Sequence, residues 1–342
     1  MSQSSPVFIV GTGRCGSTLM SNLINLHPDI LSLSEVFVSF ANEGFVRHNL
    51  DGDGLWRLLT NTAPILRQVI NPDRSPVEFT YEFTPDSPWT IKDLPACLFM
   101  TLPHFSKDPD ALYRKMEPVI RARPKAPLGE QYRFWFDWMT KEDGKKMWIE
   151  RSGNSITMVE SLQRHFPGAK FVHIHRDGRE TAMSIRNFMP LRMFLHTWTN
   201  LRRFGIDLLK PPFRYSDSRL IATFSRQFIS LLPVERYLDT VPEAAAAGRF
   251  WSAMIQQGLK ELSAVPQENV HTMTYTDLVE RPCDTLEKFI NFAAPDMDNE
   301  AWLDEASKIP KKSAPKWQEL PAAELAELEE ACAVGAKLLG YT

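Results

Sequence analysis

The sequence Phe8-Ile-Val-Gly-Thr-Gly-Arg-Cys-Gly-Ser-Thr-Leu19 decides the fold, because a short apolar run ends here in closely spaced glycines. Such a run before glycines is typical of a strand buried on both faces of a parallel sheet. The glycines fit G-x-G-x-x-G at Gly11, Gly13 and Gly16, and they also fit G-x-x-x-x-G-x-[ST] without its lysine. Both templates are typical of a turn that binds a phosphate compound.

The order of strand, loop and helix recurs along the chain, which predicts an α/β fold with a central parallel sheet flanked by helices. Ligands of such sheets bind at the carboxyl ends of the strands. We expect strands at 7–10, 30–34, 147–150, 170–175 and 270–275, and helices at about 17–26, 156–165, 180–187, 285–292 and 322–339. Residues 36–145 and 188–250 do not alternate in this way. We expect them to be helical insertions within a single domain of residues 1–342.

The composition is that of an ordinary globular protein, with 342 residues of which 43% are hydrophobic. A net charge of −3 gives no basic excess, so nucleic-acid binding is disfavoured. The four cysteines are scattered and form no C-x-x-C pair, so neither a zinc site nor a disulfide framework is indicated. The N-terminus lacks a basic region and a long apolar core. We therefore expect no signal peptide, no transmembrane segment and a cytoplasmic location.

Three ligands can be weighed for the glycine loop. A nucleoside triphosphate loop would have lysine where Ser17 stands. An NAD(P)-dependent oxidoreductase would use Gly11-x-Gly13-x-x-Gly16, with Glu35 as the acid that binds the ribose. A phosphosulfate loop would hold a 5′-phosphate on the amides of residues 13–18, while Arg14 reaches the oxygen that bridges phosphate and sulfate. A glycine turn that only packs a helix on a strand leaves Arg14 unexplained.

A second anion-binding signal lies in residues 170–184, KFVHIHRDGRETAMS. Arg176 stands at the end of an expected strand, and Ser184 lies two turns along the following helix. An arginine and a hydroxyl placed in this way can bind a phosphate by charge-assisted hydrogen bonds. Neither a nicotinamide dinucleotide nor an ordinary triphosphate needs this second site. The sequence therefore favours a ligand with two separated anionic groups.

These motifs, in this order, resemble the sulfotransferase family that uses 3′-phosphoadenosine 5′-phosphosulfate (PAPS), in particular its bacterial and carbohydrate-type branch. The resemblance is carried by TGRCGST, HPDI with Glu35, FPGAKFVHIHRDGRETAMS, YTDLVERPCDTLEKFINF, Lys316-Trp317 and a terminal LGY. It implies a P-loop-type fold and PAPS as the donor, with no metal. The cofactor-binding residues that it implies are Gly13, Arg14, Cys15, Gly16, Ser17, Thr18, Arg176 and Ser184.

Sulfuryl transfer to a hydroxyl needs a group that stabilises the leaving oxygen and a base that takes the proton. The resemblance gives the first role to Arg14 and the second to Glu35. The alternative for Glu35 is a structural ion pair with an arginine. His104 is the alternative base, since another branch of the family uses histidine.

The chain departs from the family pattern at two places. Cys15 stands where the family often has serine, and it is interpreted as a tolerated loop residue rather than an activated thiol. The glycine-rich basic motif near the C-terminus has no clear counterpart, and the basic run Lys308–Lys316 is its nearest substitute.

Several further residues have two interpretations. His173 and His175 alternate on a strand and could hold zinc, but hydrogen bonding within the sheet explains them, and no metal is expected. Arg151 in WIERS is a further cofactor candidate, and Lys92-Asp93 is either a strand-end pair on the acceptor side or a solvated ion pair.

The acceptor is not identified by the sequence, which allows a small-molecule, lipid or carbohydrate hydroxyl. The two insertions are expected to form the acceptor side. Their large apolar residues could form an apolar lid or pack in the core: Trp135, Phe136, Trp138, Phe188, Met193, Phe194 and Trp198. A non-catalytic nucleotide-binding adaptor and a homo-oligomer are both compatible with these patterns.

Overall fold

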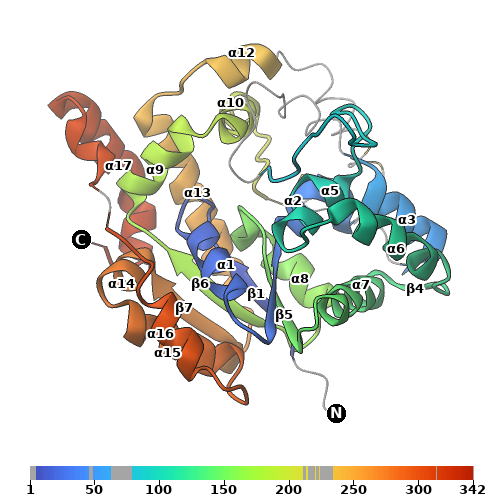
Figure 1. Ribbon diagram of the computed structural model, residues 1–342. Coiled ribbons are helices and arrows are strands. Elements are labelled where there is room, and N and C mark those ends of the chain that lie inside the picture. The colour runs from blue at the N-terminus through green and yellow to red at the C-terminus, as the bar shows by residue number, and fades with distance from the viewer. Residues whose placement is uncertain are drawn as a thin grey trace.

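The computed structural model of the chain describes residues 5–45, 49–62, 79–210, 213–214, 220, 223, 234–312 and 314–341. Its centre is a five-stranded sheet in the order β2-β5-β1-β6-β7, and every pair of neighbours is parallel (Figure 1). The strands are β1 (Val7–Val10), β2 (Ile30–Ser34), β5 (Met147–Arg151), β6 (Lys170–His175) and β7 (Val270–Thr274). The predicted α/β fold with a central parallel sheet is therefore confirmed.

Strand β1 lies in the middle of the sheet and is buried along its whole length. It pairs with β5 on one side, where Ile9 is opposite Arg151, and with β6 on the other, where Val10 is opposite His173. The short apolar run before the glycines is buried because helices cover both faces of a parallel sheet.

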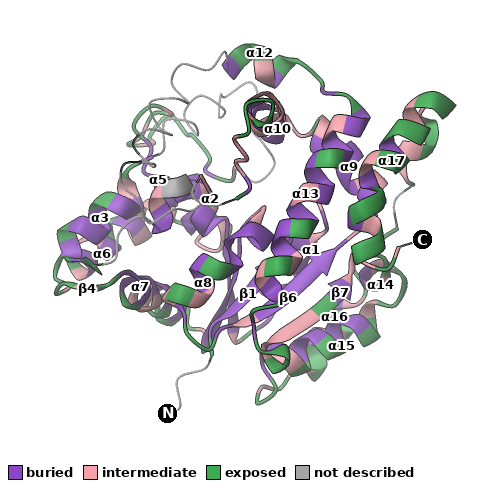
Figure 2. Ribbon diagram, turned by 180° about the vertical axis from the view of Figure 1, so that it is seen from behind, coloured by how far each residue is buried: buried purple, intermediate pink, exposed green. Residues whose placement is uncertain are grey.

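Successive side chains of β1 point into two separate apolar layers. Phe8 and Val10 belong to the layer that contains α7 (Leu128–Glu142), α8 (Val159–His165), α9 (Gly178–Asn187) and α13 (Ala244–Leu262). Val7 and Ile9 belong to the layer with α1 (Ser17–Asn25), α15 (Pro282–Ala293) and α16 (Glu300–Ala306). Figure 2 shows the buried sheet between these helices.

The helices predicted beside the sheet are present, with two differences. The helix predicted at 156–165 begins as the 3₁₀ helix η3 (Ser155–Met158) and continues as α8, because Thr157 has non-helical dihedral angles. The helix predicted near 285 is α15, preceded by the short α14 (Tyr275–Glu280). The closing segment contains η4 (Gln267–Asn269), η5 (Lys316–Glu319) and α17 (Ala322–Leu338), and α17 packs on α13.

The described parts of the two insertions are mainly helical. The first contains α2 (Val36–Phe40), η1 (Ala41–Phe45), α3 (Gly52–Thr60), α5 (Ala96–Phe99), η2 (Leu102–His104), α6 (Pro109–Arg121) and α7. It also holds a two-stranded antiparallel ribbon that the sequence did not predict, β3 (Asn49–Leu50) with β4 (Ala126–Pro127). The second contains α10 (Met189–Arg202) and α12 (Val234–Asp239).

Most of the large apolar residues considered for a lid in the two insertions lie in the hydrophobic core. Trp135 and Phe136 are completely buried and contact the rings that line one face of the sheet, while Met193 and Trp198 are also buried. Trp138, Phe188 and Phe194 are partly buried. The strand-end interpretation of Lys92-Asp93 is wrong, because these exposed residues lie in a turn in which Asp93 accepts hydrogen bonds from Thr90.

Within the described residues, no helix combines the length and the apolar character that a bilayer span requires.

Gly129 in α7 provides a test of how closely this helix approaches α8. A β-carbon at position 129 would overlap the carbonyl oxygen of His165. Alanine gains about 1 kcal/mol of helix propensity over glycine, but overlap with backbone cannot be relieved by a rotamer change. We expect Gly129→Ala to lower the free energy of unfolding by about 1–3 kcal/mol, measured by urea denaturation.

The matched control is Gly168→Asn, since a β-carbon at this exposed position meets no atom within 4 Å and asparagine tolerates its positive φ of 76°. It should lower the free energy of unfolding by less than Gly129→Ala does, because asparagine is among the residues best tolerated at positive φ and meets no overlap here. Equal effects of the two substitutions would contradict the close packing of α7 on α8.

Candidate active site

The five parallel strands end at one edge of the sheet (Figure 1), and polar residues stand at or directly after these ends. Glu35 follows β2, Arg151 ends β5, the glycine loop follows β1, Arg176 follows β6 and Tyr275 follows β7. In a parallel sheet all these ends share one edge, so residues distant in sequence are brought to one site.

The loop after β1 has the backbone conformation of a turn that wraps an anion. Gly13, Arg14 and Gly16 have positive φ values of 73°, 57° and 97°. A β-carbon on Gly13 would lie 2.7 Å from Oδ1 of Asn154, and one on Gly16 would overlap the ring of Tyr275. Gly16 is the N-cap of α1 and has no side chain to cap it. No side chain caps the first N–H groups of this helix, such as that of Thr18, and groups of this kind can donate to a ligand oxygen.

Arg14 connects the two anion-binding elements predicted from the sequence. Its Nε donates a hydrogen bond to Oγ of Ser184 at 3.1 Å, and its guanidinium carbon lies 4.5 Å from the centre of the Phe188 ring. Ser184 lies on α9, and Phe188 is the residue that ends this helix. The structure thus brings Arg14 and Ser184 together although they are 170 positions apart. Phe188 was expected only as a lid or core residue.

Arg176 is held by an aromatic ring and by an acid. Its guanidinium carbon lies 4.3 Å from the centre of the Tyr275 ring, and it forms an ion pair with Glu180 one helical turn later. Its Nε is buried and has no hydrogen-bond partner among the described residues. Burial lowers the pKa of Arg176. Neither Tyr275 nor Glu180 was predicted as a site residue, although Tyr275 follows a strand directly, as Arg176 does.

Cys15 does not present its thiol to the outer surface of the loop. The side chain is completely buried in the apolar layer beneath α1, next to Gly11. Burial raises its pKa, so the thiol stays neutral. This agrees with a tolerated loop residue, and only the backbone of Cys15 can face a bound anion.

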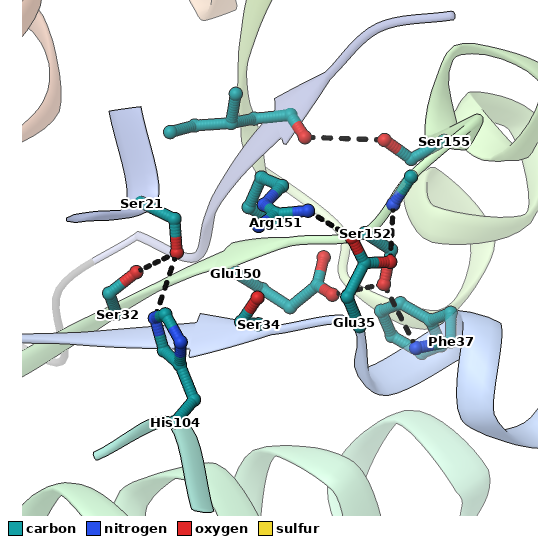
Figure 3. Close-up of polar contacts among 12 residues, drawn as sticks. Ser21, Ser32, Ser34, Glu35, Phe37, His104, Glu150, Arg151, Ser152 and Ser155 are labelled. Carbon is teal, nitrogen blue, oxygen red and sulfur yellow. Dashed lines mark hydrogen bonds and ion pairs between the residues drawn. The ribbon is translucent and has the colours of Figure 1, made fainter. Parts of the chain in front are cut away.

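Glu35 occupies a turn with a positive φ of 55° and is 5% exposed. Its backbone N–H donates to the carbonyl oxygen of Arg151 at 2.8 Å. Its carboxylate forms an ion pair with Arg151 and accepts a hydrogen bond from the N–H of Gly153 at 2.8 Å (Figure 3). The structural ion pair weighed for Glu35 is therefore present.

A second buried acid, Glu150, precedes Arg151 on β5. Oε1 of Glu150 accepts a hydrogen bond from Oγ of Ser152 at 2.5 Å, and Oε2 has no partner among the described residues. Burial, with a smaller effect of the Glu35 charge, raises the pKa of Glu150 to about 8. Glu150 is therefore mainly neutral at pH 7. Glu150 was not predicted as a site residue, although an acid inside a buried strand is unusual and can be recognised in the sequence.

His104 is turned toward α1 rather than toward an open surface. Its Nε2 lies 3.0 Å from Oγ of Ser21 and accepts from the side-chain amide of Asn25 at 2.9 Å, while Ser21 contacts Ser32 at 2.7 Å (Figure 3). Burial lowers the pKa of His104 to about 4. The imidazole is neutral at pH 7, but these contacts occupy Nε2, so the geometry favours Glu35 over His104 as base.

The remaining sequence candidates lie outside this arrangement. Burial lowers the pKa values of His173 and His175 to about 3 and about 4, and Nδ1 of His175 contacts the Tyr341 hydroxyl at 2.9 Å. Over the described residues, no three His, Cys, Asp or Glu side chains gather as a metal site would require. In the basic run, Lys308 pairs with Asp304 and Lys312 with Glu280, all at the surface.

Residues 122–228, about a third of the chain, match the family model described as the sulfotransferase family. The matched stretch includes Arg151, Arg176 and Ser184, whereas Arg14 and Glu35 precede it. The match is to the family predicted from the sequence, over this part of the chain. A search of curated proteins gives no significant match.

Solved structures with a similar course of the chain also carry sulfotransferase names. The sulfotransferase domain of the curacin biosynthetic pathway has a TM-score of 0.47 at 15% identity, and the match covers 100% of this chain and 99% of that one. Sulfotransferase STF9 from Mycobacterium avium has a TM-score of 0.43 at 17% identity, and the match covers 99% of this chain and 78% of that one. Mouse sulfotransferase SULT7A1 complexed with PAP has a TM-score of 0.40 at 12% identity, and the match covers 100% of this chain and 90% of that one.

The buried acid Glu150 makes the stability of the protein depend on pH. Its pKa is raised from 4.5 to about 8, so the folded protein keeps a proton that the unfolded chain loses. Stability should therefore fall as the pH rises through this window. Glutamine does not titrate, so the free energy of unfolding of Glu150→Gln should gain on that of the wild type from about pH 5 to about pH 8.

Urea denaturation at several pH values measures this difference. Glu319→Gln, which removes an exposed acid on η5, is the control and should show no such trend. A difference between Glu150→Gln and wild type that is constant with pH would show that Glu150 is ionised in the folded protein.

Proposed function

We propose that this chain, part of which matches the sulfotransferase family, transfers the sulfuryl group of PAPS to a hydroxyl of a small-molecule, lipid or carbohydrate acceptor. The observation that carries the proposal is the convergence of Arg14, Ser184 and Arg176 at the strand ends, beside the start of α1. PAPS carries anionic groups at the 5′ and 3′ positions of one ribose. Two arginines and a row of backbone N–H groups at one edge are suited to a ligand of this kind.

The residues divide between the two anionic groups. The backbone N–H groups of Gly13 to Thr18, with the positive end of the α1 dipole, suit the 5′-phosphosulfate. Arg176 and Ser184 suit the 3′-phosphate. Stacking on Tyr275 fixes the plane of the Arg176 guanidinium, and its buried Nε still lacks a partner among the described residues. Glu180 would share Arg176 with the phosphate, since a guanidinium has five donors.

The reaction that this arrangement supports is an in-line displacement. A bond forms between the acceptor oxygen and sulfur as the bond between sulfur and the bridging oxygen breaks, which leaves a sulfate ester and adenosine 3′,5′-bisphosphate (PAP). Arg14 stabilises the charge on the leaving oxygen, and Glu35 takes the proton of the acceptor hydroxyl. The transferred group carries less charge than a phosphoryl group, so an arginine and backbone amides can serve without a metal.

The alternatives have less support. A nicotinamide dinucleotide would use Glu35 to bind a ribose, but this carboxylate contacts Arg151 and Gly153. An adaptor that binds nucleotide without turnover would not need an acid at this position. The cytoplasmic location, a homo-oligomer, the single domain and the class of acceptor stay predictions.

Binding of PAP tests the assignment of Arg176. We expect Arg176→Ala to weaken PAP binding by about 2 kcal/mol, or roughly thirtyfold, because a charge-assisted contact is lost. Isothermal titration calorimetry measures this change. Arg164→Ala is the control, because Arg164 also forms an i,i+4 ion pair but on the surface of α8. Equal affinity of Arg176→Ala and wild type for PAP, or tighter binding of NAD than of PAP, would contradict the proposal.

The base role of Glu35 predicts a separation of turnover from binding. We expect Glu35→Gln to lower kcat for sulfuryl transfer by roughly 10²- to 10⁴-fold, while the Kd for PAP stays near that of wild type. The substitution also removes the partner of a buried arginine, so circular dichroism must show that the variant is folded. Glu35→Asp keeps the charge and should retain part of kcat. A normal kcat in folded Glu35→Gln would move the base role to another residue.

A further inference from the structure

Glu150 is a buried acid that the proposed reaction does not use, although it lies beside the proposed base. We propose that Glu150 is a positioning residue for Glu35, acting through the hydroxyl of Ser152 and the backbone N–H of Phe37. The inference rests on the proposed function, in which Glu35 is the base. It assigns a task to the β5 side chain that accepts a hydrogen bond from Ser152.

The turn at Glu35 needs support from its surroundings. A residue other than glycine in the left-handed region costs roughly 1–2 kcal/mol and persists only where neighbouring contacts hold it. On the N-terminal side, the N–H of Glu35 donates to Arg151. The carbonyl oxygen of Glu35 accepts from the N–H and the hydroxyl of Ser39 at 3.1 and 3.0 Å. Two residues after Glu35, the backbone is held by the N–H of Phe37, which donates to Ser152.

That contact is a bridge from Phe37 to Glu150. The N–H of Phe37 donates to Oγ of Ser152 at 3.0 Å, and the Ser152 hydroxyl donates to Oε1 of Glu150 at 2.5 Å (Figure 3). A serine hydroxyl has one proton and two lone pairs. Because Glu150 accepts the proton, a lone pair of the oxygen is directed at Phe37. Without an acceptor at position 150, the hydroxyl can rotate and the contact with Phe37 weakens.

The charges around the bridge agree with this role. Glu35 and Arg151 form a buried pair with no net charge, so a second carboxylate would add an unpaired negative charge. Burial holds Glu150 neutral up to a pKa of about 8. The positive charge of Arg151 also acts on the pKa values of His104 and Cys15, and both of these side chains are neutral at pH 7. Above about pH 8, ionised Glu150 repels the Glu35 carboxylate and disturbs its position.

Removing either end of the bridge tests the inference. Glu150→Leu replaces the acceptor with an apolar side chain of similar size, and Ser152→Ala removes the hydroxyl. We expect each to lower kcat by roughly tenfold to a hundredfold, because small displacements of a base are costly, with little change in the Kd for PAP. If both act through one bridge, the double variant should lose no more than the stronger single variant. Losses that multiply in the double variant would overturn the proposal.

The conservative variant separates positioning from general packing. Glu150→Gln keeps an acceptor oxygen and cannot ionise. It should restore most of the kcat that Glu150→Leu loses, and the fall in kcat that wild type shows above about pH 8 should be absent. Glu261→Gln is the control, since burial also raises the pKa of this half-buried acid on α13. Above about pH 8, the kcat of Glu261→Gln should fall in the same way as that of wild type. The same alkaline fall in Glu150→Gln and wild type would overturn the proposal.

Two outcomes distinguish this inference from the proposed function. If Glu35→Gln abolishes turnover while Glu150→Leu leaves kcat and the pH profile unchanged, Glu35 is the base and Glu150 does not position it. If folded Glu35→Gln is fully active, the base role itself fails, and the positioning role fails with it. Amide hydrogen exchange at Phe37 reports on the bridge without any turnover, and it should be faster in Glu150→Leu than in wild type.

Discussion

The site depends on the parallel pairing of β1 with a strand on each side. Because β5 and β6 flank β1 in register, the loop after β1 lies between Arg151 and the residue that follows His175, which is Arg176. The strand is buried along its length, so the loop begins from a fixed point. A slip of one residue in either ladder would turn the side chains of that strand to the opposite face. The position of the groups that we propose to bind the donor is thus set by the sheet as well as by the loop.

Each arginine at this edge is held by a partner from another part of the fold. Arg14 contacts a serine and a phenylalanine of α9, Arg151 pairs with the acid after β2, and Arg176 stacks on the tyrosine after β7. Long flexible side chains lose conformational entropy when they bind a ligand. Part of that loss is already met by these contacts in the fold, which leaves the guanidinium groups oriented.

The sequence predicted the sheet well, because buried parallel strands are short apolar runs ended by glycine or polar residues. β1, β2 and β6 have the predicted bounds, and α1 and α17 differ from prediction by a residue at the end. It also predicted the loop, Arg176 and Ser184, which stand at positions fixed by strand ends. It could not predict Glu150 beside Glu35, or Phe188 under Arg14, because such pairs are set by tertiary packing. The ribbon β3–β4 was missed because two-residue strands have no periodicity.

Arg179, the first arginine of α9, gives the site an optical consequence. The guanidinium of Arg179 lies 4.1 Å from the ring centre of Trp317, and the same side chain pairs with Asp177 and with Glu329 of α17. The indole of Trp317 therefore contacts α9 through the side chain of Arg179, and this helix begins two residues after Arg176. Trp317, one of nine tryptophans, therefore has an environment that depends on the position of α9, and its fluorescence should change when this helix moves.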